Sequence, residues 1–495
     1  MTKTPRPPIG GYKTQRHTEA RGPGPRSGGP GGPAMRGPGG PGMPARGPVR
    51  LPVKAIAPVG DTPVSLFLPC AAGVEPLLAD EVAALLGVDR AVVPADPSRR
   101  RVVEQRGGVQ VLGDARVAMQ LNLHSRLAQR VLWPLAFGPY ESEHDLYDLA
   151  RRVPWGDWIT PEQTFRIDTS ATRSPLQSLN FATLRVKDAL CDVLRDATGS
   201  RPSVDTRHPD LPLVLHLTAD TASLYADTSG EALFKRGWRD ERDGGLKGEA
   251  PLKETLAAAM LAAAGWQGRP EDGALLDPCC GAGTIAIEAA QIACGIAPGL
   301  KRRFAFERML PFRTQLSAWG QLKAEAQAAV HAPAVAIHAG DVSFRMTDFA
   351  ARNAQRAGVG HAIVFKTADA LQRPPPAEAG LLVFNPPYGE RIEAKGSRGE
   401  RGAERAVREG FAEGPAGAPE GEKDAAGAAF FSGLAAHWKR AYAGWTAWVL
   451  SPDMKLPQAL RLKEARRVPM WNGPIECRLF RFDLIAGSAR APRAE

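Results

Sequence analysis

The chain has 495 residues, 43% of them hydrophobic, which is enough for roughly two to four domains with buried cores. Its 63 Lys and Arg residues exceed its 53 Asp and Glu residues, and the net charge of +10 favours a polyanionic partner. Six scattered cysteines without a C-x-x-C pair exclude a disulfide framework and predict no zinc site. The sequence has no long apolar run and no secretory signal, which predicts a cytoplasmic protein that does not cross a membrane.

Residues 1–60 are predicted to form a disordered, basic tail rich in Gly, Pro and Arg. Their first 50 positions hold nine Lys and Arg residues against a single acidic residue, Glu19. So few aliphatic side chains cannot offset the entropy that is lost when a chain becomes ordered.

Residues 61–228 are predicted to form an α+β region. Apolar or alternating runs predict strands at 64–68, 109–112, 164–168, 211–217 and 222–226. Helical spacing of apolar residues predicts helices at 74–86, 121–135, 145–153 and 181–194. A polar, glycine-punctuated stretch follows, so we expect residues 229–250 to connect two domains.

Residues 251–485 alternate between helical and strand-like patterns. Helices are expected from Pro251, after Thr284 and around 348–357, and strands at 274–276, 335–338, 363–365, 381–384 and 445–450. This order is typical of an α/β fold with a doubly wound parallel sheet. Asn472-Gly473 between the runs 465–470 and 475–483 predicts a hairpin, so the sheet should finish with an antiparallel pair. Residues 394–428 are predicted to be a disordered insertion and residues 486–495 a tail.

The stretch 277–284 (DPCCGAGT) continues an apolar strand into a glycine turn and a helix. Gly281 and Gly283 let a ligand approach the backbone, and Asp277 can bind a hydroxyl or ammonium group. The dinucleotide pattern G-x-G-x-x-G is not met because Ala286 stands at its last position, and no phosphate loop follows. By itself the turn is equally consistent with tight strand-to-helix packing, and Cys279 and Cys280 are interpreted as small packing residues.

Acidic residues follow three successive predicted strands, at Asp277, Asp341 and Asp369. The carboxyl ends of parallel strands share one edge of the sheet, where α/β folds bind their ligands. Each acid alone would more simply cap a helix or belong to a loop. Three acids in register favour a ligand site.

A fourth predicted strand runs into Asn385-Pro386-Pro387-Tyr388. The prolines lack amide donors and stiffen the turn, so the Asn385 amide oxygen and the Pro386 carbonyl can act as paired acceptors. The Tyr388 ring can stack on a planar base. The loop therefore favours a site for a base with an exocyclic amine over a rigid structural turn.

These motifs resemble those of class I S-adenosylmethionine (SAM)-dependent methyltransferases, and NPPY resembles the subset that methylates exocyclic amino groups of bases. Residues 186–189 (VKDA) and 199–202 (GSRP) look like a THUMP domain, an RNA-binding module usually preceded by a ferredoxin-like segment. Further stretches, namely DTSG at 227–230, KRG at 235–237, APLKE at 250–254 and WNG at 471–473, extend the resemblance. The arrangement over residues 61–485 is similar to bacterial 23S rRNA guanine-N2 methyltransferases of the RlmL type. Such enzymes can carry a second methyltransferase unit at the C-terminus, which we expect to be lacking here.

The resemblance implies a Rossmann-like methyltransferase domain behind ferredoxin-like and THUMP domains, with SAM as cofactor. Gly281 and Gly283 would pass under the methionine part of SAM, with Asp277 near its ammonium group. Asp341 would accept hydrogen bonds from the ribose hydroxyls, and Asp369 from the adenine amine.

The resemblance also implies how the target amine would be held. Asn385 and the Pro386 carbonyl would accept its two hydrogens, and Tyr388 would stack on a base extracted from its helix. No metal is required for this transfer.

RNA is the expected partner, and no obligate protein partner is predicted. Arg185, Lys187, Arg201 and Arg207 are candidate phosphate contacts, although each is equally consistent with a solvated surface charge. The basic tail would add weak, sequence-independent affinity for RNA.

Three other functions remain open on the sequence. A tRNA guanine-N2 methyltransferase would combine the same kinds of module, and adenine-N6 methylation uses the same kind of loop. A non-catalytic RNA-binding ribosome assembly factor is the alternative from another class, against which the intact acids, glycines and Asn385 argue.

Overall fold

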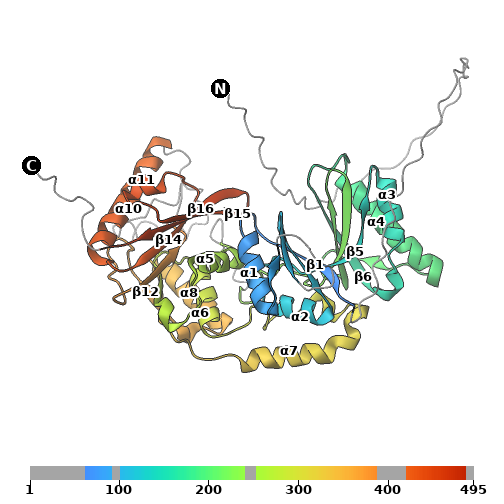
Figure 1. Cartoon of the computed structure of the whole chain (residues 1–495), viewed down its shortest axis with the longest axis horizontal. Coiled ribbons are helices and arrows are strands. Elements are labelled where there is room, and N and C mark those ends of the chain that lie inside the picture. The colour runs from blue at the N-terminus through green and yellow to red at the C-terminus, as the bar shows by residue number, and fades with distance from the viewer. Residues whose placement is uncertain (1–61, 92–100, 240–251, 387–419, 486–495) are drawn as a thin grey trace, which may run out of the picture.

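The structure is a computed structural model that describes residues 62–91, 101–239, 252–386 and 420–485 (Figure 1). Two mixed sheets, each with its own helices, organise these residues. We call residues 62–239, which hold the first sheet, the N-terminal half, and residues 252–485, which hold the second, the C-terminal half. Among the described residues no helix is long and apolar enough to cross a membrane.

The N-terminal half contains a nine-stranded sheet. Its strands, in spatial order, are β2 (Arg90–Ala91), β3 (Val102–Gln105), β4 (Gly108–Gly113), β1 (Val64–Pro69), β5 (Leu132–Pro139), β9 (Thr221–Asp227), β8 (Leu211–Leu217), β6 (Thr164–Ala171) and β7 (Ser203–Val204). Its helices are α1 (Glu75–Leu86), α2 (Ala115–His124), α3 (Glu143–Arg151) and α4 (Leu179–Thr198). The α+β organisation predicted for this region is confirmed.

The helix predicted over residues 121–135 is wrong in both position and extent. Helix α2 begins earlier because the Asp114 side chain accepts a hydrogen bond from the Val117 amide at 2.9 Å, and it ends at His124 before an extended Ser125. Residues 132–135 belong instead to β5, which pairs with β9. Pro134 fits this strand and would have removed a hydrogen bond from a helix.

The C-terminal half contains a seven-stranded sheet. Its strands, in spatial order, are β12 (Ile363–Thr367), β11 (Ile337–Asp341), β10 (Ala274–Asp277), β13 (Gly380–Phe384), β14 (Thr446–Ser451), β16 (Ile475–Asp483) and β15 (Arg466–Asn472). The first five run parallel, and β16 pairs antiparallel with both β14 and β15. The doubly wound sheet with a final antiparallel pair is therefore confirmed.

Helices cover both faces of the seven-stranded sheet. They are α5 (Glu254–Ala264), α6 (Thr284–Ala293), α8 (Phe344–Ala357), α10 (Glu420–Ala441) and α11 (Leu456–Leu460), while α7 (Leu316–Ala328) runs toward α2 of the other half (Figure 1). Leu275 packs into the core that contains Ile287 of α6, and Leu276 into the core that contains Trp438 of α10. Successive residues of a buried parallel strand thus face opposite layers.

Two predictions for the C-terminal half need correction. The strand expected at 335–338 is β11, which runs on to Asp341 because it pairs along its length with β12. The predicted insertion 394–428 ends in helix, since α10 starts at Glu420. The helix continues because Phe431, Leu434 and Trp438, at helical spacing, are buried against the sheet. The rest of that insertion and both predicted tails lie outside the described residues.

The end of the N-terminal half, Asp227–Arg239, is packed in the contact with the C-terminal half. The Arg236 Nε atom lies 3.1 Å from Glu288 Oε1 on α6, and its Nη2 atom donates to the Arg126 carbonyl at 2.7 Å. Arg126 in turn lies 3.4 Å from Glu288 and donates to the Ile296 carbonyl at 2.5 Å. The start of the predicted connector therefore fixes α6 against the N-terminal half, while residues 240–250 of that connector lie outside the described residues.

Candidate functional site

The three predicted carboxylates come together at one edge of the C-terminal sheet. Asp277 ends β10, Asp341 ends β11, and Asp369 follows β12 by two residues. The three strands are parallel neighbours, so their carboxyl ends meet at the same edge. This is the edge at which doubly wound sheets bind ligands.

Asp277 is a buried carboxyl group with few partners. It is 1% exposed, and its Oδ1 atom accepts a hydrogen bond from the Cys279 amide at 3.3 Å. Burial raises the pKa of Asp277 to about 8, and the negative charge of Asp341 adds to that rise. The Cys279 amide and the positive charge of Arg373 oppose it. A cation bound beside Asp277 would favour its ionised form.

Asp341 holds the glycine turn in place. Its Oδ2 atom accepts from the Gly281 amide at 3.1 Å, and its Oδ1 atom accepts from the Ser343 amide at 3.0 Å. Burial raises the pKa of Asp341 above its ordinary value. Because each carboxylate oxygen has two lone pairs, acceptor capacity remains for a ligand hydroxyl.

Asp369 lies in a turn at the same edge and is half-buried. Its Oδ1 atom accepts from the Leu371 amide at 2.9 Å, and its carbonyl accepts from the Arg373 amide at 2.9 Å. The turn therefore fixes the carboxylate, and among the described residues its Oδ2 atom keeps lone pairs for a further donor.

The two glycines of the turn have different physical roles. Gly283 has a φ of +83°, and a Cβ atom there would lie 3.0 Å from the Cβ of Ala350, so it permits close packing of α6 on α8. Gly281 has a φ of +50°, and a Cβ atom there would meet nothing within 4 Å. The open space beside Gly281, next to buried carboxylates, fits the close approach of a ligand to the backbone.

The residues after β13 present an unpartnered acceptor. Asn385 Oδ1 is buried and accepts no hydrogen bond in the described part of the chain, and Pro386 is buried. Leaving such an oxygen unpaired costs about 1–3 kcal/mol. Asn385 is therefore poised to receive a donor. Tyr388 lies outside the described residues, so its predicted stacking role stays a prediction.

Arg239 is a residue of the site that the sequence reasoning missed. Its Nη2 atom donates to Thr284 Oγ1 at 2.7 Å, and its Nε atom lies 2.5 Å from Glu254 Oε1. It thereby ties the first residue of α5 to the first residue of α6, directly after the glycine turn. The sequence signal that could have identified Arg239 is its position between the KRG motif at 235–237 and the APLKE motif at 250–254.

Arg373 is a second missed residue, and no sequence pattern distinguishes it. It is 4% exposed, and its Nη1 atom has no hydrogen-bond partner among the described residues. A Cβ atom at Gly340 would collide with this guanidinium, so glycine is required there. Tyr442 and His437 donate to the Arg373 carbonyl at 3.0 and 2.7 Å and fix its backbone. Its positive charge stabilises the ionised form of Asp277.

The adjacent cysteines of the glycine turn are poor nucleophiles. Burial raises the pKa of Cys279 and of Cys280 well above that of an ordinary thiol, and the neighbouring aspartates add to the effect. Both therefore remain thiols at neutral pH, in keeping with their interpretation as packing residues.

The predicted RNA contacts on the N-terminal half are ion-paired with acids. Lys187 Nζ lies 2.8 Å from Asp188, and Arg185 lies 3.9 Å from the same carboxylate. Arg201 lies 3.1 Å from Asp192. Each cation keeps some exposure, but the adjacent carboxylates reduce its field. Arg207 is exposed on the same half. Their role in RNA binding stays a prediction.

Three family models match the chain. The RlmL ferredoxin-like domain matches residues 65–132, the THUMP domain residues 140–227 and the RMKL-like methyltransferase domain residues 236–401. The chain thus carries ferredoxin-like and THUMP domains in front of a class I, SAM-dependent methyltransferase domain. The predicted domain limits at 61, 228, 251 and 485 stay predictions because these matches begin and end elsewhere.

Curated relatives give the most specific comparison. The chain is 35% identical over 421 residues to the ribosomal RNA large subunit methyltransferase K/L of Psychromonas ingrahamii, covering 84% of this chain and 49% of the relative. It is 35% identical over 452 residues to the protein of that name from Syntrophotalea carbinolica, covering 88% of this chain and 56% of the relative. The chain therefore spans about half the length of the curated relatives it matches.

Solved structures share the fold over most of the chain. The structure of SMU.472 in complex with SAH (S-adenosylhomocysteine) has a TM-score of 0.69 at 23% identity, covering 87% of this chain and 100% of its own. A predicted N6-adenine-specific DNA methylase from Listeria monocytogenes has a TM-score of 0.67 at 25% identity, covering 85% and 96%.

Proposed function

We propose that this protein transfers a methyl group from SAM to the exocyclic N2 amine of a guanine in 23S rRNA. The observation that carries this proposal is the buried Asn385 Oδ1, which accepts no hydrogen bond from the described residues, at the sheet edge that also holds Asp277, Asp341 and Asp369. The THUMP domain and the large-subunit rRNA methyltransferases among the relatives support RNA as the substrate. A cytoplasmic location belongs to the same proposal.

The residues of the turn fit the cofactor. SAM, when bound, supplies an electrophilic methyl group on a positively charged sulfur. Asp277 would pair with its ammonium group, and the open space at Gly281 would admit it against the backbone. Asp341 and Asp369 retain lone pairs for the ribose hydroxyls and the adenine amine. That one neighbouring fold binds SAH supports this assignment.

Asn385 and Pro386 would bind the target amine, which is the nucleophile of the reaction. A guanine amine is a weak nucleophile because its lone pair is delocalised into the ring. If the Asn385 oxygen and the Pro386 carbonyl accept its two hydrogens, the nitrogen becomes more tetrahedral and its developing positive charge is stabilised. Preorganised acceptors of this kind contribute about 3–4 kcal/mol per group, and the proton leaves after transfer.

The target base would have to leave its helical stack to reach Asn385, because base-modifying enzymes cannot reach their target atoms inside a duplex. Tyr388 would stack on the extracted ring. The N-terminal half would hold the surrounding RNA through phosphate contacts, with the basic tail adding affinity that depends on salt.

Adenine-N6 methylation is the second candidate, because one similar structure is that of a predicted N6-adenine-specific DNA methylase. Paired acceptors suit any exocyclic amine, so Asn385 and Pro386 do not discriminate between the two bases.

The test is mass spectrometry of rRNA and tRNA nucleosides from cells lacking the protein, combined with methyl transfer by the purified full chain. Loss of N2-methylguanosine from 23S rRNA, restored in vitro, would support the proposal. Loss of the same nucleoside from tRNA would identify tRNA as the substrate instead. Loss of N6-methyladenosine would identify the adenine N6 amine as the target. No change in any nucleoside, with no SAM binding, would favour a non-catalytic assembly factor.

A further inference from the structure

The hairpin of β15 and β16 extends past the edge of the sheet that carries the site. Ser451, the last residue of β14, pairs with Arg478, so the hairpin residues from Met470 to Cys477 lie beyond the end of β14. Strand β13 is parallel to β14, with Phe384 opposite Val449. Asn385 and Pro386 therefore leave the sheet at the level where the hairpin begins to project.

The register of the strands also places Arg478 in the same cross-strand row as Pro386. Such a row consists of residues that lie opposite one another on neighbouring strands. Cross-strand partners share a face of the sheet, and Ser451, Arg478 and Pro469 form one such row. Pro386 follows Phe384 by two residues, as Ser451 follows Val449, so Pro386 continues this row. Two strand spacings, about 10 Å, separate Pro386 from Arg478.

Arg478 and Trp471 form a cation–π pair where the hairpin begins to project. The Arg478 guanidinium carbon lies 5.8 Å from the centroid of the Trp471 ring, and its Nη2 atom lies 2.6 Å from Glu476 Oε1. Trp471 is half-buried, while Ile475 at the tip is 44% exposed. An indole and a guanidinium are the planar groups on which unpaired bases stack.

The hairpin is seated against the N-terminal half. Gly73, between β1 and α1, has a φ of +82°, and a Cβ atom there would collide with the Pro469 carbonyl and lie 3.1 Å from the Trp471 ring. Figure 1 shows β15 on the side of the C-terminal sheet that faces α1. Trp471 of this pair thus lies where the two halves meet.

We propose that Arg478 and Trp471 bind the unpaired RNA nucleotide next to the target base. This inference rests on the proposed function, since it deepens the account of how the same site receives its RNA. A base extracted toward Asn385 leaves its neighbour without a stacking partner, and the pair offers one about two strand spacings away. The WNG motif at 471–473 would then serve substrate binding as well as the hairpin turn.

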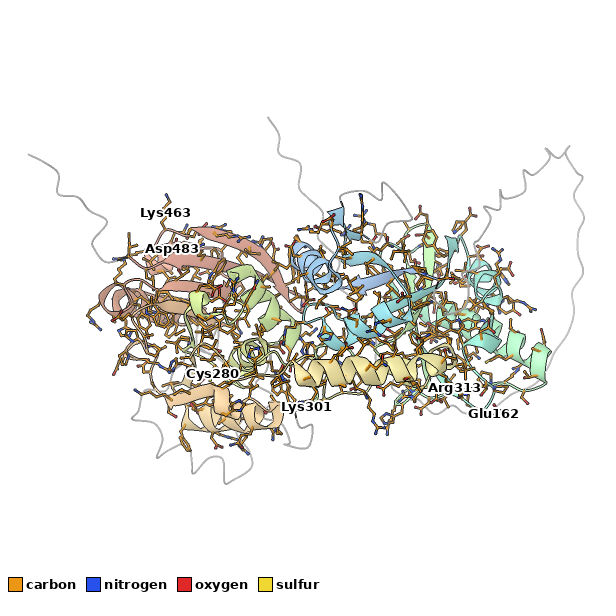
Figure 2. All side chains as sticks on the ribbon, turned by 60° about the horizontal axis from the view of Figure 1, so that its bottom comes forward. Glu162, Cys280, Lys301, Arg313, Lys463 and Asp483 are labelled. Carbon is orange, nitrogen blue, oxygen red and sulfur yellow. The ribbon has the colours of Figure 1, made fainter. Side chains whose placement is uncertain are left out.

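Arg481 provides a matched control on the same strand. Its Nε atom lies 2.8 Å from Asp483, and its guanidinium carbon lies 6.0 Å from the centroid of the Trp448 ring. Its neighbours are thus an acid two residues away and a tryptophan, as for Arg478, but it lies three residues further along β16, opposite Trp448 and away from the carboxyl edge of the sheet. Figure 2 shows Asp483 away from Cys280 of the glycine turn. The Arg481 side chain is 41% exposed against 21% for Arg478, so a nonspecific charge effect would be at least as large at Arg481.

The experiment compares Arg478→Gln with Arg481→Gln in the full chain. The probes are a fluorescent, mixed-sequence single-stranded RNA 12-mer and an unmodified 23S rRNA transcript as methyl acceptor. We expect Arg478→Gln to weaken binding of the 12-mer roughly fivefold or more and to raise KM for the transcript, with kcat little changed. Arg481→Gln should change either value less than about twofold. Binding of SAH and Tm should be the same in both variants.

Trp471→Leu keeps the apolar character of the position and removes the wide ring. It should reproduce the loss of RNA affinity while the affinity for SAH stays unchanged, which keeps the test decisive if Arg478→Gln folds poorly. Equal effects at positions 478 and 481, or none at either, would overturn the proposal. A wild-type protein that binds the 12-mer and methylates no RNA would contradict the proposed function, while the comparison of variants would still decide whether the pair binds RNA.

Discussion

Arg236 and Glu288 form a buried ion pair in which Nε lies 3.1 Å from Oε1 and Nη2 lies 3.4 Å from Oε2. Arg126 approaches the same carboxylate from the N-terminal half. Glu288 lies on α6, which begins immediately after the glycine turn. One carboxylate thus joins Arg126, in the ferredoxin-like domain, and Arg236 to the helix that follows the glycine turn.

Removing the carboxylate of this pair should destabilise the protein strongly. Glu288→Ala leaves two guanidinium groups without their shared partner, so the free energy of unfolding should fall by about 3–5 kcal/mol. Urea denaturation measures this change. Asp80→Ala is the control, because Asp80 pairs with Arg90 at 2.7 Å on the surface, where the loss should stay below about 1 kcal/mol. Equal losses of unfolding free energy at the two positions would show that the buried ion pair stabilises the protein no more than the surface pair does.

Asn385→Ala should separate catalysis from cofactor binding. Removing one acceptor of the developing charge should lower kcat about 10²–10³-fold, while the Kd for SAM changes little. Single-turnover methyl transfer and calorimetry measure the two quantities. A large loss of SAM affinity in this variant would mean that Asn385 supports the cofactor site instead of the target amine.

Asp341→Ala should weaken SAM binding before it lowers the rate of methyl transfer. The substitution removes the acceptors for the Gly281 and Ser343 amides and, under the proposed function, the acceptor for a ribose hydroxyl. The Kd for SAM should therefore rise about tenfold or more before kcat at saturating SAM falls. Titration calorimetry with SAH gives the same comparison without turnover. If Asp341→Ala and Asn385→Ala lost both properties equally, misfolding would be the explanation, and circular dichroism would reveal it.

Cofactor binding should depend on pH through Asp277. With a pKa of about 8 in the free protein, this carboxyl group is mostly protonated at pH 7, and it must lose its proton to pair with an ammonium group. Affinity for SAH should therefore increase as pH rises toward about 8, by at most about tenfold per pH unit, and binding near pH 7 should release a proton. Calorimetry in buffers of different ionisation enthalpy counts that proton. Asp277→Asn should abolish the release, and an unchanged release would assign it to another group.

Gly283→Ala should destabilise the glycine turn by two effects. The position has a φ of +83°, and the new Cβ atom would press on Ala350 at 3.0 Å. We expect a loss of about 2–4 kcal/mol, of which about 1 kcal/mol is the backbone penalty. Gly265→Ala isolates that penalty, because Gly265 has a φ of +72° with nothing within 4 Å of the added atom. Thermal denaturation compares the two, and equal shifts in Tm would contradict the packing argument.

Local patterns in the sequence were sufficient for much of the C-terminal fold and site. Apolar runs and glycines predicted the strand of Leu275 and Leu276 and the turn that follows it, because hydrophobic periodicity and φ preference act over a few residues. The shared edge of Asp277, Asp341 and Asp369 followed from parallel strand order. The Asn472-Gly473 turn predicted the hairpin because its backbone geometry matches the twist of paired strands.

Tertiary structure decided what depends on partners far apart in the chain. Residues 132–135 form a strand because β9 pairs with them. Glu288 forms ion pairs with Arg126 and Arg236, which no local sequence pattern connects to it. Lys187 was predicted to contact phosphate as a basic residue of the THUMP-like region, and only the structure shows that it is paired with Asp188. Arg373 reached the carboxylates only because Gly340 leaves room for it. Hydrophobic period and turn preference are local properties, whereas burial, ion pairing and pKa depend on which distant side chains share a volume, and that is settled only when the chain packs.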